Sequence, residues 1–488
     1  AFLEHKAAQR FGIAHFALLR KQAEQLARQQ HPGVDVNIVQ IYRALPSLAS
    51  CSEAQADAIM ALERETELAM LHPHHEICEA ARTLASQGKR LVLVSDMYLD
   101  SAFLRQVLAR HDLDFFDALY VSNETGARKD TGAMWNLLPQ HEQVEKSQWL
   151  HVGDNEHSDI QRPVDQGFLH PVHVLRAADQ FMLFNEEAAA WMAPGQWQEG
   201  LLLGLMANHI FLPGCAAAPI DIDCIRRRVC IHSLHDFGYL TIGPALTSFM
   251  AWLLQRAQVD GIGQLLYASR EGHLLVQAHE QIARHLTPLG AAPVPGAYLL
   301  CSRAATGLAA IQSPDKLEIL LGAHFEGSFE ALLRRRYCIE DLTPFTKRVG
   351  LQIMQQPGRL PEDRARFLDL LNQCYDLLEA EAQTARQRYT DYIQALIEDR
   401  RAALVDIGYG ATIQKALSGF VQGIAGGYYF VTTDKARDVE STGQFAQGCF
   451  GDGLNPFHTG LPLYQYSLLL EAVLSAPDGE FLRYDDNS

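Results

Sequence analysis

Two carboxylates five residues apart follow a short apolar run, 149–153. They are Asp154 and Asp159, with Asn155 and Ser158 between them. Carboxylates at the carboxyl end of a parallel strand lie where open α/β sheets bind their ligands. Oxygen donors at this spacing suit a hard divalent cation such as Mg²⁺. A turn with a helix cap accounts for the same residues, because Asp, Asn and Ser all favour such caps.

Two other apolar runs end in groups that can hold phosphate. One run ends at Ser95, and a second run precedes Lys129. A hydroxyl and an ammonium group bind phosphate oxygens, and the Asp154–Asp159 carboxylates can hold the Mg²⁺ that bridges to the same phosphate. The sequence therefore predicts a phosphate site with Ser95 and Lys129 as catalytic groups and Asp154 and Asp159 as metal ligands.

The elements that must position these groups alternate in type. Apolar runs at 90–96, 118–122, 149–153 and 168–174 are separated by segments with helical periodicity. This alternation predicts an α/β domain with a parallel, doubly wound sheet. Continuous apolar runs indicate strands that are buried on both faces. Residues 1–88 have an almost entirely helical pattern.

The set of strand ends resembles the haloacid dehalogenase-like (HAD) superfamily of phosphohydrolases. Ser95 matches the second motif of that family, Lys129 the third, and the Gly-Asp and Ser-Asp pairs within 153–159 the fourth. The resemblance covers residues 1–175, with 1–88 as the helical cap. It implies Mg²⁺-dependent hydrolysis of a phosphate monoester.

The first motif of the family, a strand that ends Asp-x-Asp and supplies the nucleophile, is absent from this chain. The chain starts at Ala1, inside the helical cap. We expect the motif to lie upstream, because carboxylates arranged for a metal would repel each other without one. The alternative is a catalytically dead HAD remnant that acts as a scaffold.

Two strand ends in the second half carry a Ser-Arg pair at an expected helix start. Arg270 follows a predicted strand at 263–268, and Arg303 follows another at 297–301. Guanidinium groups beside helix N-termini are good anchors for phosphate, by charge and by geometry. Taken singly, either arginine is explained better by a surface salt bridge.

A third strand end, at 401–412, resembles a phosphate-binding loop. Gly408 and Gly410 let the backbone approach a ligand, Thr412 can bond an oxygen, and Asp406 can hold Mg²⁺ or ribose hydroxyls. A capped β–α turn is the alternative. Three such ends in one domain predict a site for an anionic ligand.

The second half, about 180–485, resembles a module fused to HAD domains in dual-domain bacterial ribofuranosyltransferases of polysaccharide biosynthesis. The similar stretches are SREGH, the CSR strand end, VDIGYGAT and the segment around Glu471. The resemblance implies a glycan phosphoribosyltransferase domain at 176–488. Its donor would be phosphoribosyl diphosphate (PRPP) and its acceptor a glycan or lipid-linked glycan. The HAD domain would then remove the 5-phosphate from the transferred ribose.

For this activity we expect Arg270 and Arg303 to bind phosphates, with the 408–412 loop on the 5-phosphate or the diphosphate. Asp406 or Glu271 would hold metal or hydroxyls. Glu471 is a further candidate because an unpaired carboxylate in its apolar context is costly, although a structural salt bridge accounts for it equally. A competing hypothesis is a HAD sugar-phosphate phosphatase whose C-terminal half only binds glycan.

The bulk properties set outer limits. A length of 488 residues makes two domains the default. A net charge of −17 argues against broad binding to nucleic acid. Nine cysteines without a C-x-x-C pair fit a reduced, cytoplasmic protein.

The apolar run 237–254 contains Pro244, so we expect a buried helix from there to about residue 256, with no membrane span. The resemblance implies work at the periphery of the inner membrane, beside other polysaccharide-assembly enzymes.

Overall fold

The computed structural model is mixed α/β and describes residues 2–185, 197–213, 222–286, 292–322 and 324–483. The chain divides into two compact units, Ala1–Leu240 (unit 1) and Thr241–Ser488 (unit 2). The boundary expected at 175/176 falls inside unit 1, because helices α10 (Ala177–Phe184), α12 (Trp197–Phe211) and α13 (Ile222–Arg228) share a small apolar core there.

The first part of unit 1 is helical, as expected. Asn37 and Ser52 begin two of the helices with capping boxes, in which side chain and backbone satisfy each other's free N–H groups. The buried faces of the first four helices form one core that also takes in Leu99 and Phe103, whereas the fifth helix has no buried residue. The helices are α1 (Phe2–Phe11), α2 (Phe16–Gln30), α3 (Ile38–Ala44), α4 (Glu53–Met70) and α5 (His75–Ser86).

The four strands expected in unit 1 are present, but they do not form one sheet. They are β1 (Val92–Ser95), β2 (Ala118–Val121), β3 (Leu150–Gly153) and β4 (His170–His173). β1 pairs with β2 and β3 pairs with β4, each in parallel, and in the described part of the chain no ladder joins the two pairs. The expected four-stranded sheet is therefore replaced by two parallel pairs, each with an unpaired edge. The segments between them form α6 (Ser101–Arg110), α7 (Ser122–Thr125), α8 (Ala133–Glu142), a π-helical turn (Glu156–Gln161) and α9 (Arg162–Asp165).

The prediction that these strands are buried on both faces is wrong for β3. Leu150 is 56% exposed and Val152 is 41% exposed. The alternate residue His151 packs against buried Trp135 of α8, with ring centroids 4.5 Å apart. One face of the β3–β4 pair is thus covered, whereas its other face presents apolar side chains to solvent.

Unit 2 contains one five-stranded parallel sheet, in the order β11-β10-β9-β5-β6. With the five strands renumbered along the chain and read from the β6 edge, this order is 2-1-3-4-5, an arrangement found in doubly wound folds. The order reverses between β5 and β9, and ligands of such sheets bind at the carboxyl ends of the strands there. The strands are β5 (Gln264–Ala268), β6 (Gly296–Leu299), β9 (Ala402–Asp406), β10 (Ile424–Thr433) and β11 (Phe445–Leu454).

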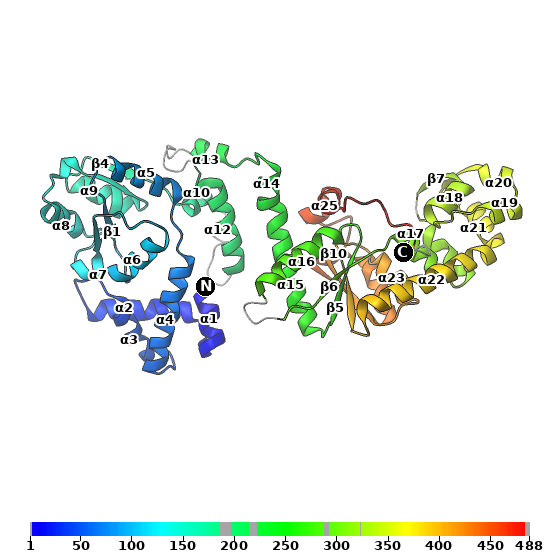
Figure 1. Cartoon of the computed structure of the whole chain (residues 1–488), viewed down its shortest axis with the longest axis horizontal. Coiled ribbons are helices and arrows are strands. Elements are labelled where there is room, and N and C mark those ends of the chain that lie inside the picture. The colour runs from blue at the N-terminus through cyan, green and yellow to red at the C-terminus, as the bar shows by residue number, and fades with distance from the viewer. Residues whose placement is uncertain (1, 186–196, 214–221, 287–291, 323, 484–488) are drawn as a thin grey trace. The chain divides into compact units, whose positions relative to one another are not determined.

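Helices cover both faces of this sheet (Figure 1). Along β5, Leu265 and Tyr267 belong to one apolar core and Leu266 and Ala268 to the other, as the two-residue period of a strand requires. One core is completed by α15 (Gly243–Val259), α16 (Gly272–Leu286) and α25 (Ser467–Leu474). The other is completed by α17 (Arg303–Ala309), α22 (Tyr375–Ile397) and α23 (Thr412–Ser418).

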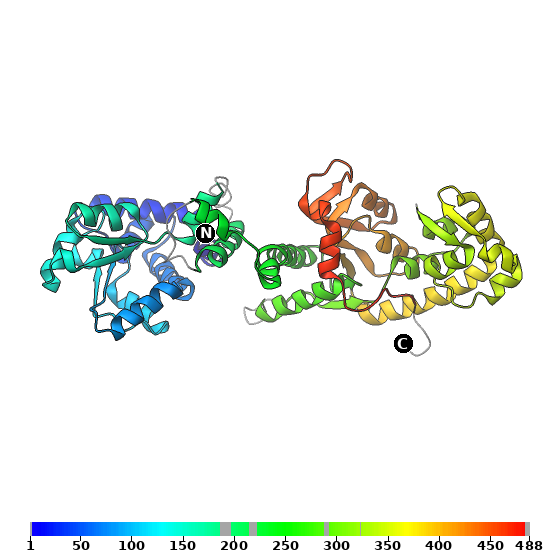
Figure 2. The ribbon, with the colours of Figure 1, turned by 90° about the horizontal axis from the view of Figure 1, so that it is seen from above.

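A third, mainly helical core lies at one end of unit 2. Figure 2 shows the long helix α22 running from this region to the sheet. Its buried side chains belong partly to this third core and partly to the sheet core that contains Leu266. The region consists of β7 (Phe325–Ser328), α18 (Phe329–Arg336), α19 (Thr343–Val349), α20 (Leu351–Gln355), β8 (Pro357–Leu360) and α21 (Arg364–Gln373). β7 and β8 form an antiparallel pair.

The helix expected from Pro244 is longer and less buried than the sequence suggested. α14 (Leu234–Phe237), a π-helical turn (Gly238–Ile242) and α15 form one helical run of 26 residues. Pro244 lies at the start of α15, where proline is tolerated because it lacks only an N–H of the first helical turn. By length and composition alone the run could cross a membrane. Only 17% of its most apolar 18-residue stretch is buried. The buried residues lie on one face of α15, against the sheet.

Candidate functional site

A cavity of about 250 Å³ lies at the reversal point of the unit 2 sheet. Its wall comes from residues just after β5, β6 and β9, together with two residues from the C-terminal segment. Arg270, Glu271, Arg303, Asp406, Gly408 and Glu471 all line it, so the structure brings together most of the site residues expected in the second half. Gly410 and Thr412 are not among its lining residues.

The two arginines reach the cavity from neighbouring strand ends. Arg270 is 3.9 Å from the Glu271 carboxylate and keeps about half of its side chain exposed. Arg303 is the first residue of α17, whose N-cap Ser302 accepts a hydrogen bond from the Ala305 N–H at 3.1 Å. Within the described part of the chain Arg303 forms no ion pair, and it is exposed. Its guanidinium is therefore available to an anionic ligand.

Asp406 ends β9 at the floor of the cavity. Burial disfavours its charged form and the nearby Glu271 carboxylate repels it, so the pKa of Asp406 rises from 3.8 to about 7. Arg303 and the Ile407 N–H, which donates to Asp406 Oδ1 at 2.7 Å, oppose that rise only in part. A carboxyl with this pKa can take or give a proton near neutral pH.

Acidic groups outnumber basic ones around the cavity. Asp406, Glu271, Glu471 and Glu480 are acidic, and the two arginines are basic. Four carboxylates against two guanidinium groups leave a surplus of two negative charges when all are ionised. Glu480 was not singled out by sequence reasoning, because it stands in a polar terminal stretch with no local pattern to mark it. Only the fold brings it to the strand ends.

The loop after β9 matches the expected phosphate-binding loop at one glycine. Gly408 has a φ of 149°, and a Cβ there would lie 2.6 Å from the Val431 carbonyl oxygen, so this position requires glycine. At Gly410 an added Cβ would find its nearest atom 3.6 Å away, an ordinary contact. Ala411 adopts the left-handed region and Thr412 then begins α23 at an exposed position. This turn carries the Thr412 hydroxyl away from the cavity lining.

Two hydrogen bonds that the sequence did not predict join two of the strand ends. The Ser269 hydroxyl donates to the Cys301 carbonyl at 2.6 Å and accepts from the Cys301 N–H at 3.0 Å. These two bonds fix the spacing of the segments that carry Arg270 and Arg303. Burial raises the pKa of the Cys301 thiol to about 12, so this side chain stays neutral.

In unit 1 the expected phosphate-site residues are partly assembled. Lys129 Nζ lies 2.6 Å from Asp159 Oδ1, and His151 Nε2 lies 3.1 Å from the same oxygen. The other oxygen accepts from the Asn155 N–H at 3.1 Å. Although burial opposes ionisation, the bonds from His151 and Lys129 prevail and lower the pKa of Asp159 to about 2. Asp159 is thus a fixed carboxylate that holds Lys129 in place.

Asp154 is the more accessible of the two expected metal ligands. Its side chain is 51% exposed, and one oxygen lies 3.5 Å from Arg176 Nε. Ser95 ends β1, and the next residue, Asp96, accepts the Lys129 N–H with both oxygens at 2.9 and 3.0 Å. This pair of bonds joins the end of β1 to the lysine loop. The carboxyl ends of both strand pairs therefore meet around Lys129.

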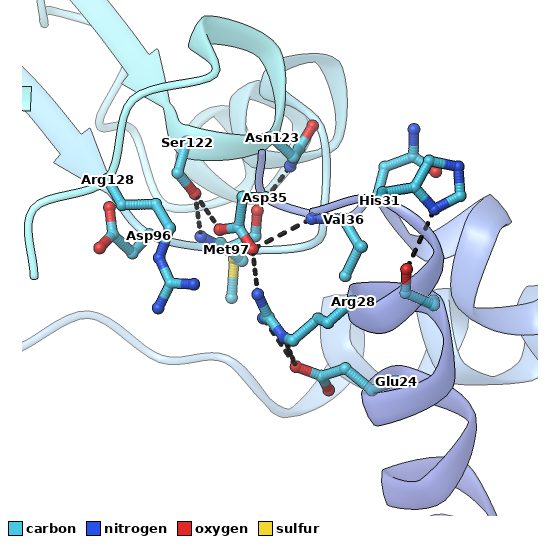
Figure 3. Close-up of polar contacts among 12 residues, drawn as sticks. Glu24, Arg28, His31, Asp35, Val36, Asp96, Met97, Ser122, Asn123 and Arg128 are labelled. Carbon is cyan, nitrogen blue, oxygen red and sulfur yellow. Dashed lines mark hydrogen bonds and ion pairs between the residues drawn. The ribbon is translucent and has the colours of Figure 1, made fainter. Parts of the chain in front are cut away.

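A buried carboxylate outside the expected set connects the helical part of unit 1 to this region (Figure 3). Asp35 accepts hydrogen bonds from Arg28 of α2, from the Ser122 hydroxyl and from the Val36 N–H. Ser122 in turn accepts the Met97 N–H at 3.0 Å. The network fixes the ends of β1 and β2 against the helices.

The sequence matches no protein-family model and no curated protein. Support for a function therefore comes from the geometry of the two sites.

Proposed function

We propose that unit 2 transfers a phosphoribosyl group from PRPP to a hydroxyl of a glycan or lipid-linked glycan. One observation carries the proposal: two arginines and four carboxylates converge on one cavity at the reversal point of a parallel sheet. A donor with phosphates at two positions and vicinal hydroxyls between them offers a partner to both kinds of group.

In this proposal Arg270 and Arg303 bind phosphate oxygens of the donor. Both are exposed at the cavity rim, and neither is tied up in a close bidentate pair with a carboxylate. The loop at Gly408 lines the same cavity, and its close approach to the Val431 carbonyl oxygen requires glycine there.

The carboxylates fit Mg²⁺, which prefers hard oxygen ligands. A diphosphate entering a cavity with surplus negative charge would be repelled unless a cation came with it. Glu271 and Glu471 are the side chains we assign to the metal. When bound, Mg²⁺ would neutralise charge on the leaving diphosphate.

Asp406 is assigned the proton transfer. The bond between ribose C1 and the diphosphate oxygen breaks, and its electron pair leaves with the diphosphate. The acceptor hydroxyl oxygen forms the new bond to C1, and its proton passes to the ionised Asp406 carboxylate, whose pKa of about 7 suits a base at neutral pH.

We further propose that unit 1 removes the 5-phosphate from the transferred ribose. Lys129 is held beside Asp159 at 2.6 Å, Ser95 ends the neighbouring strand, and Asp154 remains accessible to Mg²⁺. The nucleophile would come from an Asp-x-Asp strand that pairs with the open edges of β1 and β3. The separate strand pairs, each with an open edge, support such an added strand.

The deciding experiment measures diphosphate release from PRPP with Mg²⁺ and a panel of glycan acceptors. Arg303→Ala should lower kcat/KM for PRPP about a hundredfold, because a charge-assisted bond contributes about 3 kcal/mol at most. Arg284→Ala, which removes an exposed arginine on α16 of the same unit, is the matched control and should be unchanged. Unchanged transfer in Arg303→Ala would contradict the assignment.

A second assay separates the competing hypotheses. Diphosphate release without phosphate release, in the full-length protein, would leave unit 1 as a scaffold. Phosphate release from sugar phosphates without any diphosphate release would favour the phosphatase with a glycan-binding C-terminal half.

A further inference from the structure

Three side chains of types that can bind metal ions lie close together in unit 1, and none of them is among the residues assigned above. His209 lies on α12, and His235 and Asp236 lie on α14. One ligand atom from each of the three lies within 4.8 Å of the others. In the described part of the chain this is the one such group of histidine, cysteine and carboxylate side chains.

Asp236 is held in position by its neighbours. Its Oδ2 accepts the Ser233 hydroxyl at 2.9 Å and the His232 N–H at 3.2 Å. Its Oδ1 faces His209 Nε2 at 2.9 Å. Outer hydrogen bonds that orient one oxygen are typical of carboxylates that bind metals.

The two histidine rings are arranged around one tyrosine. The His209 ring stacks on Tyr239, with centroids 4.5 Å apart, and the His235 ring lies nearly parallel to the same tyrosine at 6.2 Å. The stacking fixes the plane of His209. His235 is exposed, so its ring can turn toward the other two ligands without displacing packed side chains.

The donor set and its spacing suit zinc better than magnesium. Two imidazoles and one carboxylate form a ligand set used for Zn²⁺, whereas Mg²⁺ favours oxygen ligands alone. Zinc bonds of about 2.0–2.2 Å place neighbouring tetrahedral ligands roughly 3.3–3.5 Å apart. The His209–Asp236 pair is already near this spacing, and only His235 has to close.

We propose that His209, His235 and Asp236 bind one Zn²⁺ ion, with a fourth position left to water. A simple hydrogen bond between His209 and Asp236 involves two of the residues, whereas a bound ion would use the ligand atoms of all three. The bound ion would join α12 to α14, two segments separated by more than twenty residues in the chain. The proposal does not depend on the phosphoribosyl transfer proposed for unit 2.

The test is calorimetric titration of the whole chain with zinc chloride, in a buffer with excess Mg²⁺ that occupies oxygen-only sites. The wild type should bind one equivalent with a saturable isotherm. His235→Ala should weaken that binding at least about tenfold, the lower end of what loss of even an outer partner costs. His235 is exposed, so this variant should keep its fold, which circular dichroism of the zinc-free protein checks.

His75→Ala is the matched control, because His75 is another exposed histidine on a helix of unit 1, with 85% of its side chain accessible. It should bind zinc as the wild type does. The visible absorption of the Co²⁺-loaded protein gives a second readout, with tetrahedral bands expected in the wild type and lost in Asp236→Asn. Zinc binding of equal strength in the wild type and His235→Ala, or no saturable binding in the wild type, would overturn the proposal.

Discussion

Replacing Asp406 with Asn should stabilise unit 2 at alkaline pH and should abolish the phosphoribosyl transfer that we propose for this unit. The pKa of this carboxyl is about 7 in the folded protein, against 3.8 ordinarily, because of burial and the neighbouring Glu271. The folded state therefore holds the proton more tightly than the unfolded chain does. Stability from this group is complete below about pH 4 and falls as the pH rises through 7.

The magnitude follows from the shift of about three pKa units. At about 1.4 kcal/mol per pKa unit, the raised pKa of Asp406 lowers the free energy of unfolding, relative to its value at low pH, by about 4 kcal/mol at pH 8 and by only about 1.5 kcal/mol at pH 5. The substituted asparagine would not ionise, and its side-chain oxygen can still accept the Ile407 N–H that Asp406 Oδ1 accepts at 2.7 Å. The stability gap between variant and wild type should therefore widen by about 2.5 kcal/mol from pH 5 to pH 8.

Differential scanning calorimetry at the two pH values measures this gap. A change of about 2.5 kcal/mol corresponds to a Tm difference of roughly 5–10 °C for a unit of this size. Asp434→Asn is the matched control, because exposed Asp434 also accepts the N–H of the next residue, at 2.9 Å. It should show no such widening. The reasoning is refuted if Asp406→Asn gives the same gap at both pH values or is less stable than the wild type at pH 8.

Two further substitutions test local geometry. Gly408→Ala should destabilise unit 2 by about 2 kcal/mol or more in urea unfolding, because the new Cβ would lie 2.6 Å from a backbone oxygen, whereas Gly410→Ala should stay within about 1 kcal/mol; equal effects would contradict the assigned strain. Lys129→Ala should destabilise unit 1 by about 3 kcal/mol near neutral pH, because it leaves buried Asp159 short of a partner. Since the Asp159 pKa is depressed to about 2, the stability it contributes is present above about pH 4 and is lost toward pH 2, so the variant and wild type should converge in acid unfolding; a gap unchanged by acid would contradict the pairing.

The alternation of strands and helices was predictable because buried strands leave apolar runs that end at polar turns. β5, β6 and β9 are all found close to their expected positions. β11 was missed because its sequence, FAQGCFGDGL, has three glycines and no sustained apolar run. The position of the helical region α18–α21 beside the sheet could not be predicted from the sequence. It depends on α22, whose buried side chains belong to the core of that region and to a core of the sheet.

The part of the site that follows parallel strands was predictable, because the carboxyl ends of such strands lie at the same edge of the sheet. Arg270, Arg303 and Asp406 each follow or end a strand, so parallel pairing alone brings them together. Thr412 fails this reasoning, because the turn at Ala411 sets the direction of the next helix and the sequence does not reveal it. Glu480 fails it because its position depends on how the C-terminal segment returns to the sheet.

The balance of charge in the cavity also bears on the choice between a transferase and a glycan-binding domain. An uncharged sugar could form hydrogen bonds to these six charged side chains through its hydroxyls, but it could neutralise none of their charge. Among the described residues that line the cavity none is aromatic, so there is no flat apolar surface for a sugar ring. A polyanionic donor that arrives with Mg²⁺ satisfies guanidinium and carboxylate groups together. The surplus of carboxylates then becomes a requirement of the chemistry, which is why the transferase proposal accounts for more of this cavity than glycan binding does.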